Sequence, residues 1–326
     1  MKIYIVKSTS PYETLAYENL IMEDPSITGD VLVLYQHANA IIIGNNQNAY
    51  EEINREYVRD HKIVLARRKS GGGAVYHDLG NLNFSFISDK SDDNSYVKFL
   101  RPIINFLNSL GLESEFHGRN DIHANGCKIS GNAQYISGKR IVSHGTLLFD
   151  VDMTILSKAL NPNKIKFESK GIKSIRSRVA NINDLLPKKM TVDEFKDTLV
   201  KYFVENENCT LEEIPYEKYA ERFEELRSLF SSEKWIYDRS ANFTYTKTEK
   251  FPGGLVTVYG TIENSIIKDI IFAGDFLSKK DIRDVEPLFK GIRYDEKSVR
   301  EVLTKIDIEN YFGTLTEDEI VKIILG

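Results

Sequence analysis

Short runs of apolar residues, bounded by glycine, asparagine or charged residues, mark the first half of the chain. The runs at residues 31–35, 40–43 and 63–66 are brief and partly β-branched, a pattern that predicts buried strands. Residues 83–87 alternate polar and apolar side chains, which predicts a half-buried strand, and residues 140–149 predict another. The hydrophobic pattern therefore predicts a sheet made of several short strands.

Helical spacing of apolar side chains appears between these runs. Ser10, Pro11 and Glu13 predict a helix entry, with a capping serine, a proline in the first turn and a glutamate that completes a capping box. Residues 96–110 also have helical spacing and end before a glycine. Pro102 lies inside this stretch, so the helix is expected either to kink there or to begin there.

After residue 187 the spacing of apolar residues becomes clearly helical. Thr191 and Glu194 predict a second capping box, and the apolar stripes that follow are expected to pack against the core. The pattern resets near residue 240, where residues 255–262 and 266–272 predict a hairpin and helical patterns begin near residues 278, 298 and 316. We therefore predict an α+β protein of two domains, residues 1–240 and a small α/β domain at residues 241–326.

Composition narrows the class of protein. The 326 residues are 41% hydrophobic and 28% charged, with a net charge of −5, so we expect a soluble globular protein that is not a general nucleic-acid binder. Two distant cysteines do not form a disulfide framework, and they favour a reducing compartment. The first 22 residues lack a signal-like apolar stretch, and no apolar run is long enough to span a membrane. These features predict a cytoplasmic protein without a membrane partner.

The most informative stretch joins three cations to three glycines, from Arg67, Arg68 and Lys69 through Ser70 to Gly71, Gly72 and Gly73. Adjacent glycines lose much conformational entropy on ordering, so they are expected where a ligand approaches the backbone and its N–H groups. The cations would add charge for a phosphate or carboxylate. A solvated surface loop is the plain alternative, but the loop lies between two apolar strands. The sequence matches neither the P-loop nor the Rossmann fingerprint.

A second segment places Lys128 among small residues, with Gly126 and Gly131 nearby. There its ammonium group can bridge anionic oxygens, although a solvated surface lysine is the ordinary expectation. Asp121 is a candidate magnesium ligand beside a nucleotide, or a carboxylate that only caps a turn. A zinc site built from neighbouring histidines and Cys127 lacks an evident fourth ligand. Cys127 is also a candidate acyl-accepting nucleophile, although small buried cysteines are commoner.

These motifs together resemble the lipoate–protein ligase A family over nearly the whole chain. Residues 67–81 (RRKSGGGAVYHDLGN) resemble its signature loop, and residues 128–134 (KISGNAQ) resemble its active-site lysine motif. Further matching elements occur in the same order along the chain: residues 44–48 (GNNQN), 144–148 (HGTLL), 170–179 (KGIKSIRSRV), 251–254 (FPGG) and 274–276 (GDF). Each motif alone is weak, and their shared order makes the resemblance specific.

The resemblance implies that residues 1–240 form a mixed-sheet catalytic domain related to biotin protein ligases. It also implies ATP and Mg²⁺ as cofactors and lipoate as substrate. It implies that lipoate is activated as lipoyl-adenylate and that the lipoyl group is then transferred to a lysine of an acceptor protein. The acceptor it implies is a lipoyl domain of a 2-oxoacid dehydrogenase acyltransferase subunit, or a glycine-cleavage H protein. It makes Lys128 catalytic, with Arg68, Gly73, Ala74, Val75, Tyr76 and Lys128 at ATP. It places Ser70, Gly71, Gly72, Gly73, Lys128, His144 and Gly145 at lipoate, beside an apolar tunnel, and Lys170, Gly171, Ser174 and Arg178 in an adenylate-binding loop.

Three other functions remain open on sequence alone. An ATP-independent lipoyl or octanoyl transferase would use Cys127 as its nucleophile, but related transferases generally lack a second domain like that after residue 240. A non-catalytic binding protein would keep the pocket without releasing pyrophosphate. A biotin ligase would carry an arginine-rich glycine loop unlike residues 67–73. The choice between lipoate and octanoate, the acceptor and the oligomeric state are not predicted.

Overall fold

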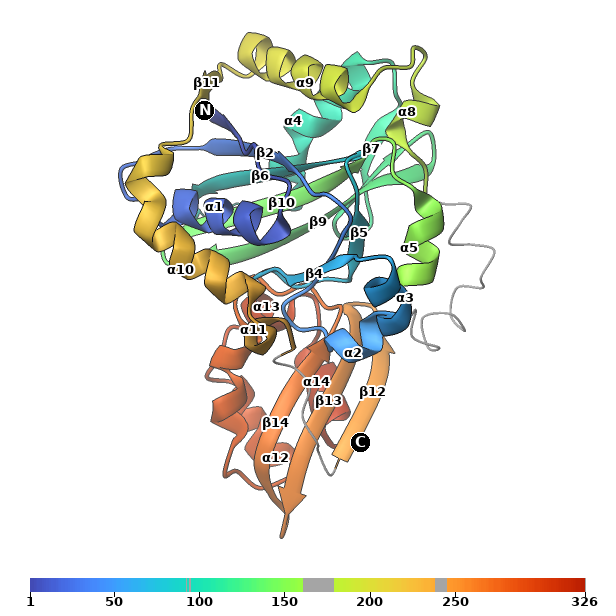
Figure 1. The fold of residues 1–326 in the computed structure, drawn as a ribbon. Helices are drawn as coiled ribbons and strands as arrows, with labels where there is room; N and C mark the ends of the chain where they lie inside the picture. The colour runs from blue at the N-terminus through green and yellow to red at the C-terminus, as the bar shows by residue number, and fades with distance from the viewer. Residues whose placement is uncertain (92, 94, 161–178, 238–244, 326) are drawn as a thin grey trace.

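The computed structural model describes residues 1–91, 93, 95–160, 179–237 and 245–325. Its largest element is a mixed eight-stranded sheet with the order β11-β1-β2-β6-β10-β9-β8-β7 (Figure 1). Strand β1 pairs in parallel with β2 and β11, and the remaining neighbours pair antiparallel. The strands are β1 (Lys2–Ile5), β2 (Val31–Gln36), β6 (Asn81–Asp89), β7 (Ser114–His117), β8 (Asp121–Ala124), β9 (Cys127–Ser137), β10 (Arg140–Leu148) and β11 (Thr210–Glu212).

A second, three-stranded sheet packs on one face of the large one. Its order is β4-β3-β5, formed by β3 (Ala40–Ile43), β4 (Val64–Arg67) and β5 (Val75–His77). The apolar side chains of β3 and β4 share a buried cluster with residues of β2, β6 and β10 on the facing surface of the large sheet. The functional cavity lies between these two sheets.

Helices cover both faces of the large sheet (Figure 1). On the face that carries the small sheet, α1 (Pro11–Glu23), α10 (Ala220–Ser231) and α11 (Glu233–Tyr237) share the same core. On the opposite face, α4 (Tyr96–Ser109) and α9 (Val192–Asn206) enclose a second core. The shorter helices are α2 (Ala49–Glu52), α3 (Arg55–Asp60), α5 (Met153–Ala159), α8 (Ile182–Leu185) and the 3₁₀ turn η1 (Tyr216–Tyr219).

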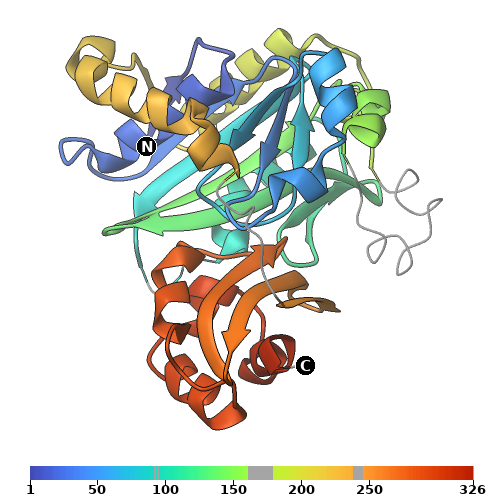
Figure 2. The same cartoon turned by 60° about the horizontal axis from the view of Figure 1, so that its bottom comes forward.

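A small C-terminal domain has its own buried core and lies beside the two-sheet body (Figure 2). An antiparallel sheet of β12 (Tyr245–Phe251), β13 (Gly254–Glu263) and β14 (Ile266–Gly274) packs with helices that follow it in sequence. These are the 3₁₀ turns η2 (Ile282–Asp284) and η3 (Glu286–Phe289), and the helices α12 (Glu296–Leu303), α13 (Ile308–Phe312) and α14 (Glu317–Leu325). The predicted boundary between residues 240 and 241 lies outside the described residues and remains a prediction.

Most predicted strands are confirmed, and one burial prediction is wrong. Strands occur at residues 31–36, 40–43, 64–67 and 140–148, and the predicted hairpin turns at Asn264 and Ser265, both with positive φ. Strand β6, predicted to be half-buried, is buried on both faces over residues 81–88. Its polar face is covered by the second sheet and by α1, and so Asn83 faces the cavity instead of solvent.

The capping predictions have mixed outcomes. The box at Thr191 and Glu194 is present in full. Ser10 is the N-cap of α1, but its hydroxyl makes no capping hydrogen bond. Helix α4 runs through Pro102 from a start at Tyr96, because the hydroxyl of Ser95 accepts a hydrogen bond from the backbone N–H of Lys98 and caps the first turn.

The helix predicted near residue 278 is wrong: residues 282–289 form two short 3₁₀ turns instead. Among the residues that the structure describes, no helix is both long and apolar enough to cross a membrane.

Candidate functional site

The glycine loop, residues 68–74, joins β4 to β5 at the edge of the cavity. Gly72 has a φ of +89°, which favours glycine. A Cβ at Gly71 would press against the backbone of Phe276 and Ser278 in the C-terminal domain, whereas at Gly73 the nearest atom lies 3.9 Å away. Packing against the second domain therefore explains Gly71, and Gly73 leaves room for a ligand at the backbone.

Arg67 is a structural residue and not a ligand-facing cation, which corrects the expectation that it adds charge to the loop. Its side chain is fully buried. The guanidinium donates hydrogen bonds to backbone carbonyls of Gly44, Asn45, Gln47, Trp235 and Ile236, at 2.5–3.0 Å. Arg67 thereby ties β4 to the turn at residues 44–47 and to α11. That turn is the GNNQN element, and a Cβ at Gly44 would overlap the carbonyl of Gly72.

Arg68 lines the cavity and also braces the loop. Its guanidinium donates to Oγ of Ser70 at 3.0 Å and to the carbonyl oxygens of Ile42, Gly71 and Gly73 at 2.6–3.1 Å. Burial lowers the pKa of Arg68 to about 10, which leaves it charged near neutral pH. The same cation therefore shapes the loop and puts positive charge at the cavity wall.

A buried hydrogen-bond chain connects the loop to α1. Oγ of Ser70 lies 2.6 Å from Nε2 of His144, and Nδ1 of His144 lies 3.0 Å from a carboxylate oxygen of Glu18. Glu18 also accepts hydrogen bonds from Ser85 and Tyr135. Burial alone would raise the pKa of Glu18, but the charge and hydrogen bond of His144 and the two hydroxyls hold it below its ordinary value. Sequence analysis missed Glu18, because a glutamate inside a helix carries no motif.

Lys128 stands on β9 at the other side of the cavity. Its ammonium lies 2.8 Å from Oδ1 of Asp121, in a pair whose side chains are 36% and 25% exposed. The backbone of Lys128 forms a parallel bridge with Val179, and the N–H of Ala180 donates to its carbonyl at 3.1 Å. The predicted adenylate-loop residues Lys170, Gly171, Ser174 and Arg178 lie outside the described residues, but the chain re-enters the described part beside Lys128.

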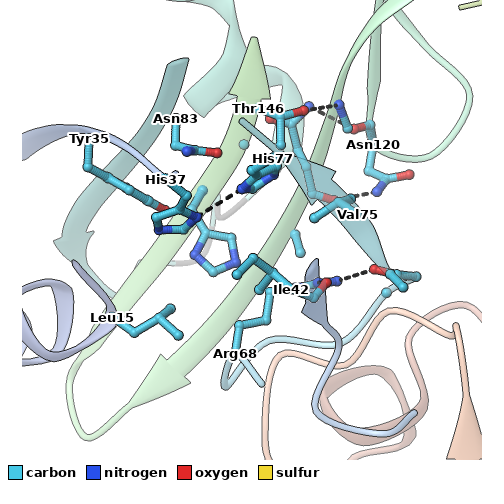
Figure 3. A pocket seen from close by; sticks show the side chains of 18 of the residues that line it. Leu15, Tyr35, His37, Ile42, Arg68, Val75, His77, Asn83, Asn120 and Thr146 are labelled. Carbon is cyan, nitrogen blue, oxygen red and sulfur yellow. Dashed lines mark hydrogen bonds between the residues drawn. The ribbon is translucent and has the colours of Figure 1, made fainter. Parts of the chain in front are cut away.

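The cavity itself has a volume of about 180 Å³ and lies between the large and small sheets (Figure 3). The wall brings together eight predicted site residues: Arg68, Gly72, Gly73, Ala74, Val75, Lys128, His144 and Gly145. It also contains residues that sequence analysis left out of the site: Leu15, Tyr35, His37, Ile42, His77, Asn83, Asn120, Asn132 and Thr146. Several of these residues lie inside the motifs quoted above, and that position was the sequence signal that could have identified them as part of the site.

Four predicted site residues do not line the cavity. Ser70 and Gly71 lie behind it, where they contact His144 and the C-terminal domain. Tyr76 is buried on the other side of β5, where its hydroxyl donates to Oδ1 of Asn39 and burial raises its pKa to about 12. Asp121 is connected to the site through its ion pair with Lys128.

The alternative chemistries find little support in the geometry. Cys127 does not line the cavity that Lys128 lines. His117 and His123 stack at 4.0 Å, yet the residues that the structure describes contain no group of three or more His, Cys, Asp or Glu side chains placed to hold a metal ion. The structure thus brings a lysine and a glycine-rich loop to one cavity between two sheets, beside a small C-terminal domain.

Comparison with known proteins gives the family. The sequence profile described as lipoyl protein ligase A/B catalytic domain matches residues 10–204, and that of the bacterial lipoate protein ligase C-terminus matches residues 240–324. The chain is 40% identical over 321 residues to lipoate-protein ligase LplJ of Bacillus subtilis, covering 96% of each chain. It is 38% identical to lipoate–protein ligase 1 of Staphylococcus aureus, covering 97% of each. The chain belongs to the lipoate–protein ligase family and is, as predicted, an enzyme.

Solved structures confirm the predicted fold class. The structure of LipL1 of P. falciparum in complex with lipoate superposes with a TM-score of 0.84 at 27% identity, over 99% of both chains. A lipoate-protein ligase A bound with ATP gives a TM-score of 0.61 at 28% identity, over 73% of this chain and 99% of the other. The archaeal bi-partite lipoate protein ligase from Thermoplasma acidophilum, solved in a study that includes its E2 lipoyl domain, gives 0.63 at 29% identity, over 75% and 98%.

Proposed function

We propose that this chain catalyses the ATP-dependent attachment of lipoate to a lysine of an acceptor protein in two steps. In the first, a carboxylate oxygen of lipoate attacks the α-phosphorus of ATP, and pyrophosphate leaves. In the second, the acceptor amine attacks the carbonyl carbon of lipoyl-adenylate, a C–N bond forms, and AMP leaves with the bonding electrons of the C–O bond. Relatives solved with lipoate and with ATP support both ligands for this chain.

One observation carries the proposal. The backbone of Gly72–Ala74 and the side chain of Lys128 line the same cavity, although more than fifty residues separate them in sequence. Attack at phosphorus builds negative charge on its oxygens, so a placed cation and backbone donors supply most of the stabilisation. No covalent nucleophile from the protein is needed. Lys128 would exchange Asp121 for the anionic oxygens of the substrates, because an ammonium group carries no fixed geometry.

We propose that a magnesium ion enters with ATP and is held beside the cavity, where Asp121 is paired with Lys128. Asp121 supplies a single hard oxygen ligand, and Mg²⁺ is commonly held by one or two carboxylates together with substrate phosphates and waters. We propose that Asp121 holds the ion after Lys128 has moved to the substrates. The bound ion would neutralise charge on the phosphate oxygens.

The acceptor is proposed to be a lipoyl-domain protein: an acyltransferase subunit of a 2-oxoacid dehydrogenase or a glycine-cleavage H protein. The archaeal neighbour, studied with an E2 lipoyl domain, supports this class of partner. We keep Lys170, Gly171, Ser174 and Arg178 as the proposed adenylate-binding residues, because Val179 pairs with Lys128 directly after them. We place the activity in the cytoplasm, where ATP is present and cysteines such as Cys127 stay reduced.

The first test is pyrophosphate release by purified protein with ATP, magnesium and lipoate, with octanoate, biotin and no acid as controls. Release that depends on lipoate is expected. Absence of release from folded protein that still binds lipoate would contradict the proposal and favour ATP-independent transfer. Transfer to a purified lipoyl domain, followed by the mass of the modified domain, then tests the second step.

A further inference from the structure

Three polar atoms in the wall of the cavity have no hydrogen-bond partner among the residues that the structure describes. One is Oδ1 of Asn132 on β9, the strand that carries Lys128, and the other two lie on β5 and β6. These two are Nε2 of His77, on β5, and Nδ2 of Asn83, on β6. Both side chains are more than nine-tenths buried, and both line the cavity from its two opposing sheets (Figure 3). A buried polar atom without a partner is unfavourable, so these two atoms indicate a ligand group that the protein does not supply.

The protons of His77 follow from its neighbours. We assign the hydroxyl proton of Thr14 to the carbonyl of Pro11, at 3.2 Å, so that the hydroxyl accepts from Nε2 of His37, at 2.6 Å. Nδ1 of His37 then carries a lone pair, and it accepts from Nδ1–H of His77 at 2.9 Å. Burial lowers the pKa of His37 to about 3 and that of His77 well below 6.5, so each ring has one proton. Nε2 of His77 therefore presents a hydrogen-bond acceptor to the cavity.

The pair lies in the part of the cavity away from Lys128. Strand order runs from β9, which carries Lys128, through β10 and β6 to β2, which carries Tyr35. Asn83 is paired with Thr146 of β10 on one side and with Tyr35 on the other. Two strand spacings separate β6 from β9, roughly 10 Å. With the carboxylate of the substrate at Lys128, as proposed above, the far end of its acyl chain reaches Asn83 and His77.

The acids that fit this space differ in the groups they offer to the pair. The chain of octanoate offers neither a donor nor an acceptor. The ring sulfurs of lipoate accept weak hydrogen bonds, and the thiols of its reduced form both donate and accept. Asn83 has a free donor and His77 a free acceptor. We propose that His77 and Asn83 recognise the sulfur atoms of the substrate: Asn83 favours lipoate over octanoate, and His77 adds a preference for the dithiol form.

This inference rests on the proposed function, and its test separates the two. The measurement is kcat/KM for pyrophosphate release with lipoate, with dihydrolipoate kept under anaerobic conditions, and with octanoate. It is made on the wild type, Asn83→Leu and His77→Phe. Lipoate-dependent release by the wild type keeps the proposed function whatever the variants do.

We expect Asn83→Leu to reduce the lipoate-to-octanoate ratio by about fivefold, the effect of one buried hydrogen bond. His77→Phe should reduce the dihydrolipoate-to-lipoate ratio by a similar factor and leave the lipoate-to-octanoate ratio in place. A merely structural role, or a water held between the two side chains, predicts that all three acids change by one common factor, and that result overturns the inference. If a variant fails to fold, Asn83→Ala and His77→Leu allow the same comparison of ratios.

Discussion

At the scale of single residues, Lys128 has one partner in the structure, Asp121, and a second in the proposed reaction, the anionic oxygens of the substrates. In this structure its ammonium is paired with Asp121, and its side chain is more than one-third exposed. A pair of this exposure contributes little to stability. The same residue can therefore be removed without loss of the fold, which makes it suitable for testing the proposed chemistry.

Lys128→Ala should reduce the rate of lipoate-dependent pyrophosphate release by about 10²- to 10³-fold, the range observed when a stabilising group at a reacting centre is lost. The melting temperature should remain within about 2 °C of the wild type. Lys139→Ala, at the exposed end of the same hairpin, is the matched control and should behave as the wild type. Activity near the wild-type level in Lys128→Ala would remove this residue from the mechanism.

The sequence predicted which types of residue gather at the site. It did not predict which of two adjacent residues of the same type has its side chain at the cavity. Arg67 and Arg68 are neighbours of the same type in one motif, yet Arg67 is bonded to backbone carbonyls around α11, and only Arg68 lines the cavity. The difference depends on which distant carbonyls surround each side chain. Glu18 and Asn83 were missed for the same reason, since their roles come from neighbours brought close by the fold.

At the scale of secondary-structure elements, one side chain holds three segments together. Arg67 at the end of β4 bonds to the turn at residues 44–47 and to α11, and the indole N–H of Trp235 donates back to its carbonyl at 2.9 Å. Replacing Arg67 leaves several buried carbonyls without a donor. Such losses account for the largest effects of single substitutions on stability.

Arg67→Ala should lower the free energy of unfolding by about 3–5 kcal/mol, and the melting temperature by about 10 °C. Arg59→Ala is the matched control, because the side chain of Arg59 is 74% exposed and pairs only with a surface carboxylate among the contacts described. That control should shift stability by no more than about 0.5 kcal/mol. Both values follow from thermal melts. Equal melting temperatures for the two variants would show that the buried guanidinium is dispensable.

Elements with a clear local signal were predictable, and those defined by tertiary pairing were not. Apolar runs located β2, β3, β4 and β10, and a capping box located α9. The edge strand β11 has three residues and exists only because it pairs with β1, which lies about two hundred residues earlier. Strand β12 is largely polar or half-exposed, so no hydrophobic pattern marked it.

At the scale of the whole molecule, the C-terminal domain contacts the glycine loop directly. The N–H of Gly72 donates to the carbonyl of Phe276 at 3.1 Å, and Nδ2 of Asn46 donates to Oγ of Ser278 at 3.0 Å. The domain also has a separate buried core. Sequence predicted its existence from the change of pattern near residue 240, but not this contact, which joins residues about two hundred positions apart.

We expect residues 241–326, produced alone, to fold, because their apolar side chains are buried within the domain itself. Circular dichroism and the dispersion of amide signals in NMR spectra test this. Mixed with residues 1–240, the fragment should bind through the contacts at Gly72 and Asn46 and restore lipoate-dependent pyrophosphate release. An unfolded fragment, or a pair of folded fragments that do not associate, would contradict the predicted boundary.

The hydrogen bond between Gly72 and Phe276 has a thermodynamic consequence. The resemblance places Gly72 at lipoate, and an oxygen of that ligand that took the N–H of Gly72 would break this link between the domains. Ligand binding and domain docking would then compete for one donor. By reciprocity, any change that tightens the docked arrangement would then weaken the affinity for this ligand by the same factor, and saturating ligand would loosen the docking equally. This hydrogen bond between the two domains would in this way contribute a coupling free energy between ligand binding and domain docking.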